Sequence, residues 1–197
     1  MRSEIERWNR KYAEADAEAT PEVEPLLLEY RHLLRGKGKA LDVACGKGQN
    51  TVYLASLGFE VIGIDGSLVA LRHCQRLLER RGLKAGLIAA DLDTFPLPPN
   101  HFDLVLVVRF LDRALIPSLK ETLKPDGLLI YATYNENLLQ RRPTFNKSFL
   151  LEPGELSDLF SDFRVVATND AKALAQDTTY VIGRRAGETT RRAKPLA

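Results

Sequence analysis

The sequence is poor in the residues that build metal centres and disulfide frameworks. Its 197 residues include only two cysteines, Cys45 and Cys74, which fit no CxxC or zinc-ligand spacing. The three histidines, His32, His73 and His101, are scattered along the chain. We therefore expect the cysteines to be small buried apolar side chains, and we expect no metal site.

Long hydrophobic runs are also missing. No stretch approaches the ~20 apolar residues that a membrane-spanning helix needs. The N-terminal stretch MRSEIERWNRKY is charged and lacks the apolar segment of a secretory signal. Apolar residues make up 45% and charged residues 27%, a balance typical of a globular chain with one sizeable core. The sequence thus predicts a cytoplasmic protein without a membrane partner.

Neither sign of charge dominates, because the formal net charge is only +2. Basic residues gather at the C-terminal end, where the stretch from Arg184 to Ala197 holds five of them against Glu188. A basic tail can contact nucleic acid, but such ends are more often solvated. We expect residues 187–197 to form a flexible tail, and we do not expect nucleic acid to be the main partner.

From Lys39 onward, short apolar strands alternate with helical stretches, which indicates a mostly parallel sheet with helices on both faces. The strand after the last predicted helix follows a short segment, TNDAKALAQD, and so is expected to return antiparallel. Before Lys39, the pattern predicts one helix from Ser3 and a second from Thr20-Pro21 to Gly36. The predicted strands are 39–44, 60–64, 84–89, 103–108, 128–134, 163–168 and 178–184, and the later helices are 50–57, 67–80, 114–123 and 155–160.

A glycine turn, ALDVACGKGQN, follows the first of these strands. Gly46 and Gly48 allow backbone to approach a ligand closely, and the helix that follows favours a negative group at its N-terminus. Asp65 ends the second strand, where a carboxylate can accept both hydroxyls of a ribose. With Asp42 and Asp91, three acids stand near successive strand ends, and we expect them to face one cleft.

A dinucleotide is a poor match for this turn. The NAD fingerprint requires a third glycine, which allows close packing of helix on strand, and Thr51 stands in its place. An antiparallel final strand also departs from a doubly wound dehydrogenase sheet. Both features argue against NAD or FAD.

Five segments, LDVACGKGQN, VIGIDGS, AADLD, FDLVLVV and LKPDGLLIYATY, together resemble the motifs of class I S-adenosylmethionine-dependent methyltransferases. The resemblance implies an α/β fold, a three-layer sandwich around a mostly parallel seven-stranded sheet whose last strand is antiparallel. The segments WNRKYAE, FLDRALIP and RRPTFNKSFLLEPGELSDLF are similar to tellurite-resistance-type methyltransferases and their unclassified relatives. Two departures stand out. Ala44 replaces the family's first glycine, a change that suits a negative φ, and DAKALAQDTTY lacks a His-Arg pair typical of members that act on tellurite.

The resemblance also implies roles for individual residues toward S-adenosylmethionine, with S-adenosylhomocysteine as product. The turn would approach the methionine part, Asp42 would position its amine, and Asp65 would bind the ribose. Asp91 and the Leu92 N–H would bind the adenine, and the N-terminal helix with Trp8 and Tyr12 would cover the site. The full cofactor set is Trp8, Tyr12, Asp42, Ala44, Cys45, Gly46, Gly48, Asn50, Asp65, Gly66, Ser67, Ala90, Asp91, Leu92, Val108 and Arg109.

The acceptor side is less defined by the sequence. Arg109, Asp112 and Tyr134 are the candidate catalytic residues, with Arg113 and Asn135 beside them at the ends of the fourth and fifth strands. We define the long connection as residues 135–154, which is the kind of segment that forms a substrate loop. Its basic residues, Arg141, Arg142 and Lys147, either bind an anion or form a solvated cluster.

These features predict a methyltransferase for a small-molecule acceptor: a thiol, a chalcogen oxyanion or a small hydroxylated compound. The competing interpretations are methylation of oxygen or nitrogen on a larger metabolite, a non-catalytic S-adenosylmethionine-binding protein, and a nucleic-acid methyltransferase. We expect a lid segment over 1–36, a methyltransferase domain over 37–186, and a monomer or homodimer.

Overall fold

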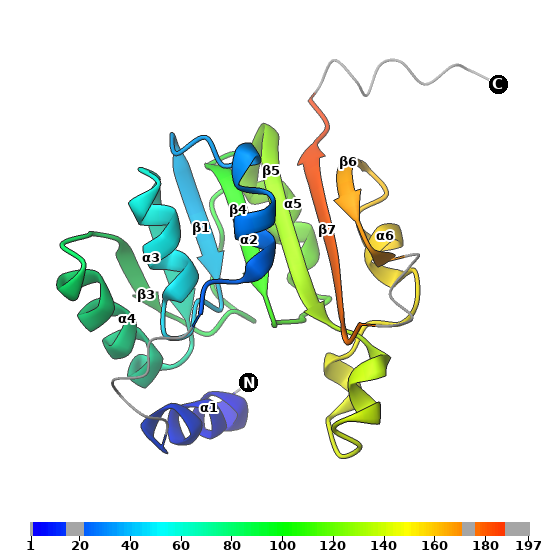
Figure 1. The fold of residues 1–197 in the computed structure, drawn as a ribbon, viewed down its shortest axis with the longest axis horizontal. Coiled ribbons are helices and arrows are strands. Elements are labelled where there is room, and N and C mark those ends of the chain that lie inside the picture. The colour runs from blue at the N-terminus through cyan, green and yellow to red at the C-terminus, as the bar shows by residue number, and fades with distance from the viewer. Residues whose placement is uncertain (1, 15–21, 171–175, 188–197) are drawn as a thin grey trace. The chain divides into compact units, whose positions relative to one another are not determined.

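The computed structural model describes residues 2–14, 22–170 and 176–187 (Figure 1). The predicted start of the second helix at Thr20-Pro21 and most of the predicted basic tail lie outside these ranges. Seven strands form one sheet, which confirms the predicted fold class. The chain divides into two compact units, Met1–Pro96 and Leu97–Ala197.

Unit 1 holds three parallel strands in the order β3-β2-β1. Its elements are α1 (Arg2–Glu14), α2 (Pro25–Glu29), a 3₁₀ turn η1 (Arg31–Leu33), β1 (Lys39–Val43), α3 (Gln49–Ser56), β2 (Glu60–Asp65), α4 (Leu68–Arg80) and β3 (Gly86–Ala89). The apolar face of α4 packs against Val52 through Cys74, Leu77 and Leu78. Both cysteines are buried and free, as predicted.

The second helix begins later than the sequence pattern predicts. It starts at Pro25, and Glu24 before it is extended with φ −55° and ψ 121°. A residue that precedes proline is sterically pushed out of the helical region, so the helix cannot continue backward through Glu24.

Unit 2 holds four strands in the order β4-β5-β7-β6, with the long strand β5 between β4 and β7 (Figure 1). Its elements are β4 (Phe102–Val108), α5 (Ile116–Thr122), β5 (Leu123–Tyr134), 3₁₀ turns η2 (Glu136–Gln140) and η3 (Lys147–Phe149), α6 (Glu155–Leu159), β6 (Phe163–Thr168) and β7 (Thr178–Arg185). β7 runs antiparallel to both β5 and β6, which confirms the predicted return of the last strand.

One boundary in unit 2 differs from prediction. The helix predicted over 114–123 ends at Thr122, and β5 begins at Leu123 rather than at residue 128. Leu123 pairs with Phe102, and Asp126 then takes a left-handed φ of 62° before the strand continues. Pro125 explains the early end of the helix, because the residue before it is disfavoured in a helix.

Candidate cofactor site in unit 1

The glycine turn after β1 is tightly wound. Ala44, Gly46 and Gly48 have φ values of 53°, 56° and 82°, all in the left-handed region. Alanine suits position 44 only with a negative φ, and this condition is not met. Ala44 therefore carries backbone strain of about 1–2 kcal/mol. Gly48 cannot be replaced by a larger residue without a clash, because a Cβ there would lie 2.6 Å from the Cβ of Cys74.

Asp65 joins the turn to the end of β2. Its Oδ2 accepts a hydrogen bond from the Gly46 N–H at 2.8 Å, and its Oδ1 accepts one from the Ser67 N–H at 2.7 Å. Burial raises the pKa of this carboxyl, and the two backbone hydrogen bonds oppose that rise. Because each carboxylate oxygen has about two acceptor positions, one on each oxygen is left for a ligand donor.

Asp42 lies deeper than the sequence suggests. It is 2% exposed within β1, and its Oδ2 accepts a 2.6 Å hydrogen bond from the Thr51 hydroxyl. Burial raises its pKa to about 7, Thr51 lowers it, and the charge of Asp65 raises it further. Thr51, whose presence argued against a dinucleotide, is therefore the partner of this acid, a role that sequence reasoning missed.

Asp91 follows β3, and the residue before it, Ala90, is hydrogen-bonded to the backbone of Asp65. The Ala90 N–H donates to the Asp65 carbonyl at 3.2 Å, while Asp91 Oδ1 accepts from the Asp93 N–H at 3.1 Å. Leu92 is buried. The three acids thus differ in depth: Asp42 is enclosed, Asp65 is bound by backbone, and Asp91 is partly exposed.

The helix α1 covers these loops with one face. A Cβ on Gly46 would lie 2.9 Å from the Tyr12 hydroxyl, and a Cβ on Gly66 would lie 2.9 Å from Ile5 Cγ1. Burial raises the pKa of Tyr12, with smaller effects from Asp65 and Cys45. Tyr12 and Ile5 of α1 therefore lie against the loops after β1 and β2, and the closure of this helix over a cofactor stays a prediction.

Asn9 is a second contact of α1 that sequence reasoning missed. The Ser67 hydroxyl donates to Asn9 Oδ1 at 2.6 Å and also accepts from the Ala70 N–H at 3.2 Å, which caps α4. Asn9 lies four residues after Ile5 and three before Tyr12, the spacing of one helical face. That spacing was the signal available in the sequence.

Two other predicted cofactor residues have partners within the protein. Asn50 Oδ1 accepts from the Glu24 N–H at 2.9 Å, which ties the segment before α2 to α3. Trp8 stacks on Tyr12 at 5.6 Å between ring centroids and lies under the Lys11 ammonium at 4.1 Å. Their roles toward a cofactor stay predictions.

The predicted acceptor-side residues belong to unit 2. Arg109 follows β4 with a left-handed φ of 56°, and its N–H donates to the Ala132 carbonyl at 2.8 Å. Asp112 Oδ1 accepts from the Ala114 N–H at 2.9 Å. Tyr134 ends β5 and packs edge-on against Phe145, with ring centroids 5.9 Å apart. Their part in catalysis stays a prediction.

Arg113 has partners other than a ligand. Its Nε and Nη2 bind the Glu155 carboxylate at 2.5 and 2.8 Å, and its guanidinium also donates to the carbonyls of Ser148 and Leu150. Partial burial alone would raise the pKa of Glu155, but the hydrogen bonds from Arg113 and the Glu152 N–H lower it overall. From the sequence we predicted that Arg113 points into the crevice. In the structure its guanidinium donates to two backbone carbonyls of the long connection.

The described residues contain no group of three His, Cys, Asp or Glu side chains that could hold a metal ion. In the same residues, no helix has the length and apolar character to cross a membrane. The residues of unit 1 fit S-adenosylmethionine at the end of β2, because Asp65 is held there by two backbone N–H groups and keeps acceptor positions for ribose hydroxyls.

Comparison with known proteins agrees with this geometry. Residues 40–127 match the methyltransferase domain family. The chain is 24% identical over 140 residues to the probable S-adenosyl-L-methionine-dependent methyltransferase TehB of Haemophilus influenzae, covering 67% of this chain and 48% of that protein. It is 29% identical over 147 residues to a ubiquinone biosynthesis O-methyltransferase of Nitrosospira multiformis, covering 68% of this chain and 62% of that protein.

The fold agrees as well. The crystal structure of TehB from Haemophilus influenzae matches with a TM-score of 0.71 at 17% sequence identity, covering 84% of this chain and 63% of that one. The chain spans only 48% and 62% of the length of the two curated relatives. Over residues 40–127 the chain therefore carries a methyltransferase domain, and it is similar to S-adenosylmethionine-dependent methyltransferases such as TehB.

Proposed function

We propose that this chain transfers a methyl group from S-adenosylmethionine to a small-molecule acceptor, which is a thiol, a chalcogen oxyanion or a small hydroxylated compound. One observation carries the proposal: the Asp65 carboxylate stands at the end of β2, fixed by the N–H groups of Gly46 and Ser67. An anion held this way is preorganised to accept the two ribose hydroxyls.

The remaining residues of unit 1 would complete the cofactor site. The backbone of the glycine turn would contact the methionine part, and the ammonium group of that part would favour the ionised form of Asp42, against the burial that raises the pKa of this carboxyl to about 7. Asp91 and the Leu92 N–H would bind the adenine. Tyr12 on α1 would cover the ribose side and exclude water.

When bound, S-adenosylmethionine supplies a methyl group on a sulfonium, so that the acceptor lone pair forms the new bond as the carbon–sulfur bond breaks and its electrons return to sulfur. The acceptor gives its proton to water. A thiol needs no strong base for this, because part of it is already thiolate near neutral pH. The chain's contribution is alignment, since a methyl transfer of this kind is an in-line displacement.

The test is calorimetric titration of the purified chain with S-adenosylmethionine and, separately, with NAD. We expect micromolar affinity for the first and no binding of the second. Asp65→Ala should weaken S-adenosylmethionine at least tenfold, about 1.4 kcal/mol, because a charge-assisted hydrogen bond is lost. Asp93→Ala, which removes an exposed carboxylate from the loop after β3, is the matched control and should bind as the parent does.

Asp65 also holds the glycine turn, so folding must be checked in the same experiment. Asp65→Asn keeps an acceptor for one backbone N–H and removes the charge, and circular dichroism with thermal unfolding shows whether each variant is folded. Unchanged affinity in folded Asp65→Ala and Asp65→Asn proteins would contradict the ribose assignment.

A further inference from the structure

One face of α1 contacts both residues whose N–H groups hold the Asp65 carboxylate. The Ser67 hydroxyl donates to Asn9 Oδ1 at 2.6 Å. A Cβ on Gly46 would lie 2.9 Å from the Tyr12 hydroxyl. Asn9 and Tyr12 are three residues apart, so they lie on the same side of the helix. Because Gly46 and Ser67 donate to the two oxygens of Asp65, α1 is connected to this carboxylate through both of its donors.

The short segment between Asp65 and α4 is enclosed by the same helix. A Cβ on Gly66, in its middle, would lie 2.9 Å from Ile5 Cγ1, so the backbone approaches α1 closely at this point. Ser67 is only 1% exposed, and its hydroxyl caps α4 while it donates to Asn9. The bond to Asn9 therefore fixes Ser67 between two helices, and with it the N–H that Asp65 accepts.

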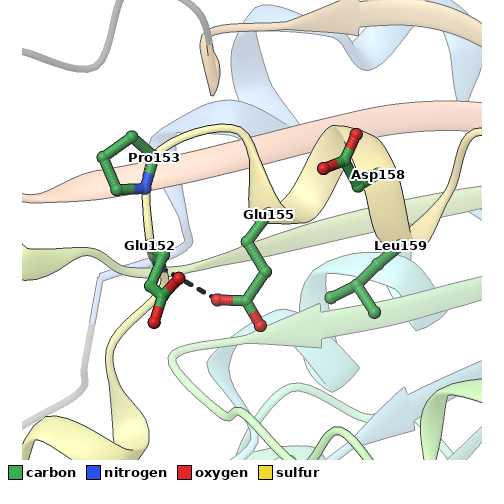
Figure 2. A pocket seen from close by; sticks show the side chains of 5 residues that line it. All are labelled: Glu152, Pro153, Glu155, Asp158 and Leu159. Atoms are coloured by element: carbon green, nitrogen blue, oxygen red, sulfur yellow. Dashed lines mark hydrogen bonds between the residues drawn. The ribbon is translucent and has the colours of Figure 1, made fainter.

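A second carboxylate held by a backbone N–H, Glu155 in unit 2, provides a contrast. Figure 2 shows Glu155 turned toward Glu152, whose N–H it accepts at 2.9 Å, among the residues that line a shallow pocket of about 340 Å³. The Arg113 guanidinium binds the same carboxylate at 2.5 and 2.8 Å and neutralises it. Asp65 is held by two uncharged N–H groups instead, so the contacts that orient it act on a charge that a ligand can use.

We infer that Asn9 is a positioning residue of the proposed ribose site, and that through Ser67 it holds the Asp65 carboxylate in the orientation that accepts ribose hydroxyls. The inference rests on the proposed function and adds a coupling to it. Because Asn9 belongs to α1, docking of this helix strengthens the binding of S-adenosylmethionine. By thermodynamic linkage, S-adenosylmethionine strengthens the docking of α1 by the same factor.

Calorimetric titration of the full chain with S-adenosylmethionine measures the effect of Asn9. Asn9→Ala should weaken the affinity about fivefold, the scale of one neutral hydrogen bond. Alanine is a better helix former than asparagine, so this loss would not come from a weaker α1. Asn9→Asp keeps the acceptor oxygen and should bind within about twofold of the parent. Arg10→Ala, at the next and exposed position, is the matched control and should leave the affinity unchanged.

A double-mutant cycle with Asp65→Asn separates positioning from a merely structural role. If Asn9 acts through the Asp65 charge, the cost of Asn9→Ala should fall from about fivefold in the parent to less than about twofold beside Asp65→Asn. If Asn9 only keeps α1 on unit 1, the cost should be the same in both backgrounds, and this result would reject the inference. Circular dichroism and thermal unfolding show whether each variant is folded.

Hydrogen exchange tests the reciprocal effect on α1. Saturating S-adenosylmethionine should slow the exchange of the α1 amides in the parent, and it should slow them less in Asn9→Ala. Equal protection in the two proteins, or no protection in the parent, would overturn the coupling.

Failure of the proposed function gives a different result. In that case neither the parent nor any variant binds S-adenosylmethionine, or folded Asp65→Asn binds it as the parent does. Either outcome rejects the ribose assignment and the role of Asn9 together. A loss of affinity with Asp65→Asn but not with Asn9→Ala rejects the role of Asn9 alone.

Discussion

The glycine turn in unit 1 and the long connection in unit 2 are held by different chemistry. The turn is fixed by partners within 19 positions of one another along the chain. Asp65 accepts from the N–H of Ser67, two positions later, and from that of Gly46, 19 positions earlier, and Thr51 donates to Asp42 from the next helix. The side chains of Arg113 and Asn135 fix the connection by donating to backbone carbonyls 35 to 41 positions away along the chain. The turn is thus built into its motif, whereas the connection depends on distant partners.

This contrast predicts that the largest effect comes from the buried acid of the turn. The pKa of Asp42 is about 7 in the folded protein, whereas an aspartate in the unfolded chain has an ordinary pKa of 3.8. The folded state therefore holds the proton more tightly. The contribution of Asp42 to the free energy of unfolding is therefore greatest below pH 3.8 and is lost as the pH rises toward 7. The full loss is at most about 4 kcal/mol, at 1.36 kcal/mol per pKa unit.

Urea unfolding of the parent and of Asp42→Asn between pH 4 and pH 8 measures this loss. Asparagine is close in shape and has no titration in this range, so the stability of the parent relative to the variant should fall with pH. Burial raises the pKa of Asp65 too, and because the charge of Asp65 also raises the pKa of Asp42, the difference between the two proteins reports the titration of this pair. A difference that is constant with pH would show that Asp42 does not titrate in the folded state.

The sequence predicted the turn better than the connection for the same physical reason. Gly46 and Gly48 act through their own backbone, so they form a pattern that is visible within a few residues of sequence. The apolar run before Asp65 predicts where β2 ends and so predicts the place of this acid. The partners of Arg113 lie 35 to 42 positions further along the chain, so their pairing with Arg113 leaves no local sequence pattern. The hydrogen bond of Thr51 to Asp42 was missed because the fingerprint compares Thr51 only with the glycine that NAD-binding proteins carry there, and says nothing of the bonds that a threonine makes.

A smaller effect is expected in unit 2 from Arg113→Met. Methionine keeps much of the side-chain length and loses four hydrogen bonds, so we expect the free energy of unfolding to fall by about 1–2 kcal/mol. Thermolysin should cleave within the long connection faster, because its backbone loses an anchor. The affinity for S-adenosylmethionine should not change.

Arg141→Ala provides the comparison for Arg113→Met. Its side chain is 74% exposed in the ion pair with Asp177, and such surface pairs contribute less than about 1 kcal/mol. Equal proteolysis of the two variants would mean that the connection is not anchored by Arg113 in particular. A change in cofactor affinity with Arg113→Met would mean that the glycine turn and the long connection are coupled and are not held independently.

The smallest effect returns to the turn, at Ala44. Its φ of 53° costs an alanine about 1–2 kcal/mol, and a glycine there costs about 0.5–1 kcal/mol of added chain entropy in the unfolded state. Ala44→Gly should therefore stabilise the protein by about 0.5–1 kcal/mol, measured by urea unfolding. Ala89→Gly, at an exposed strand position that is not among the left-handed residues, has only the entropic cost and should destabilise. Destabilisation by both variants would show that Ala44 is unstrained and that the turn accepts a side chain where the family carries glycine.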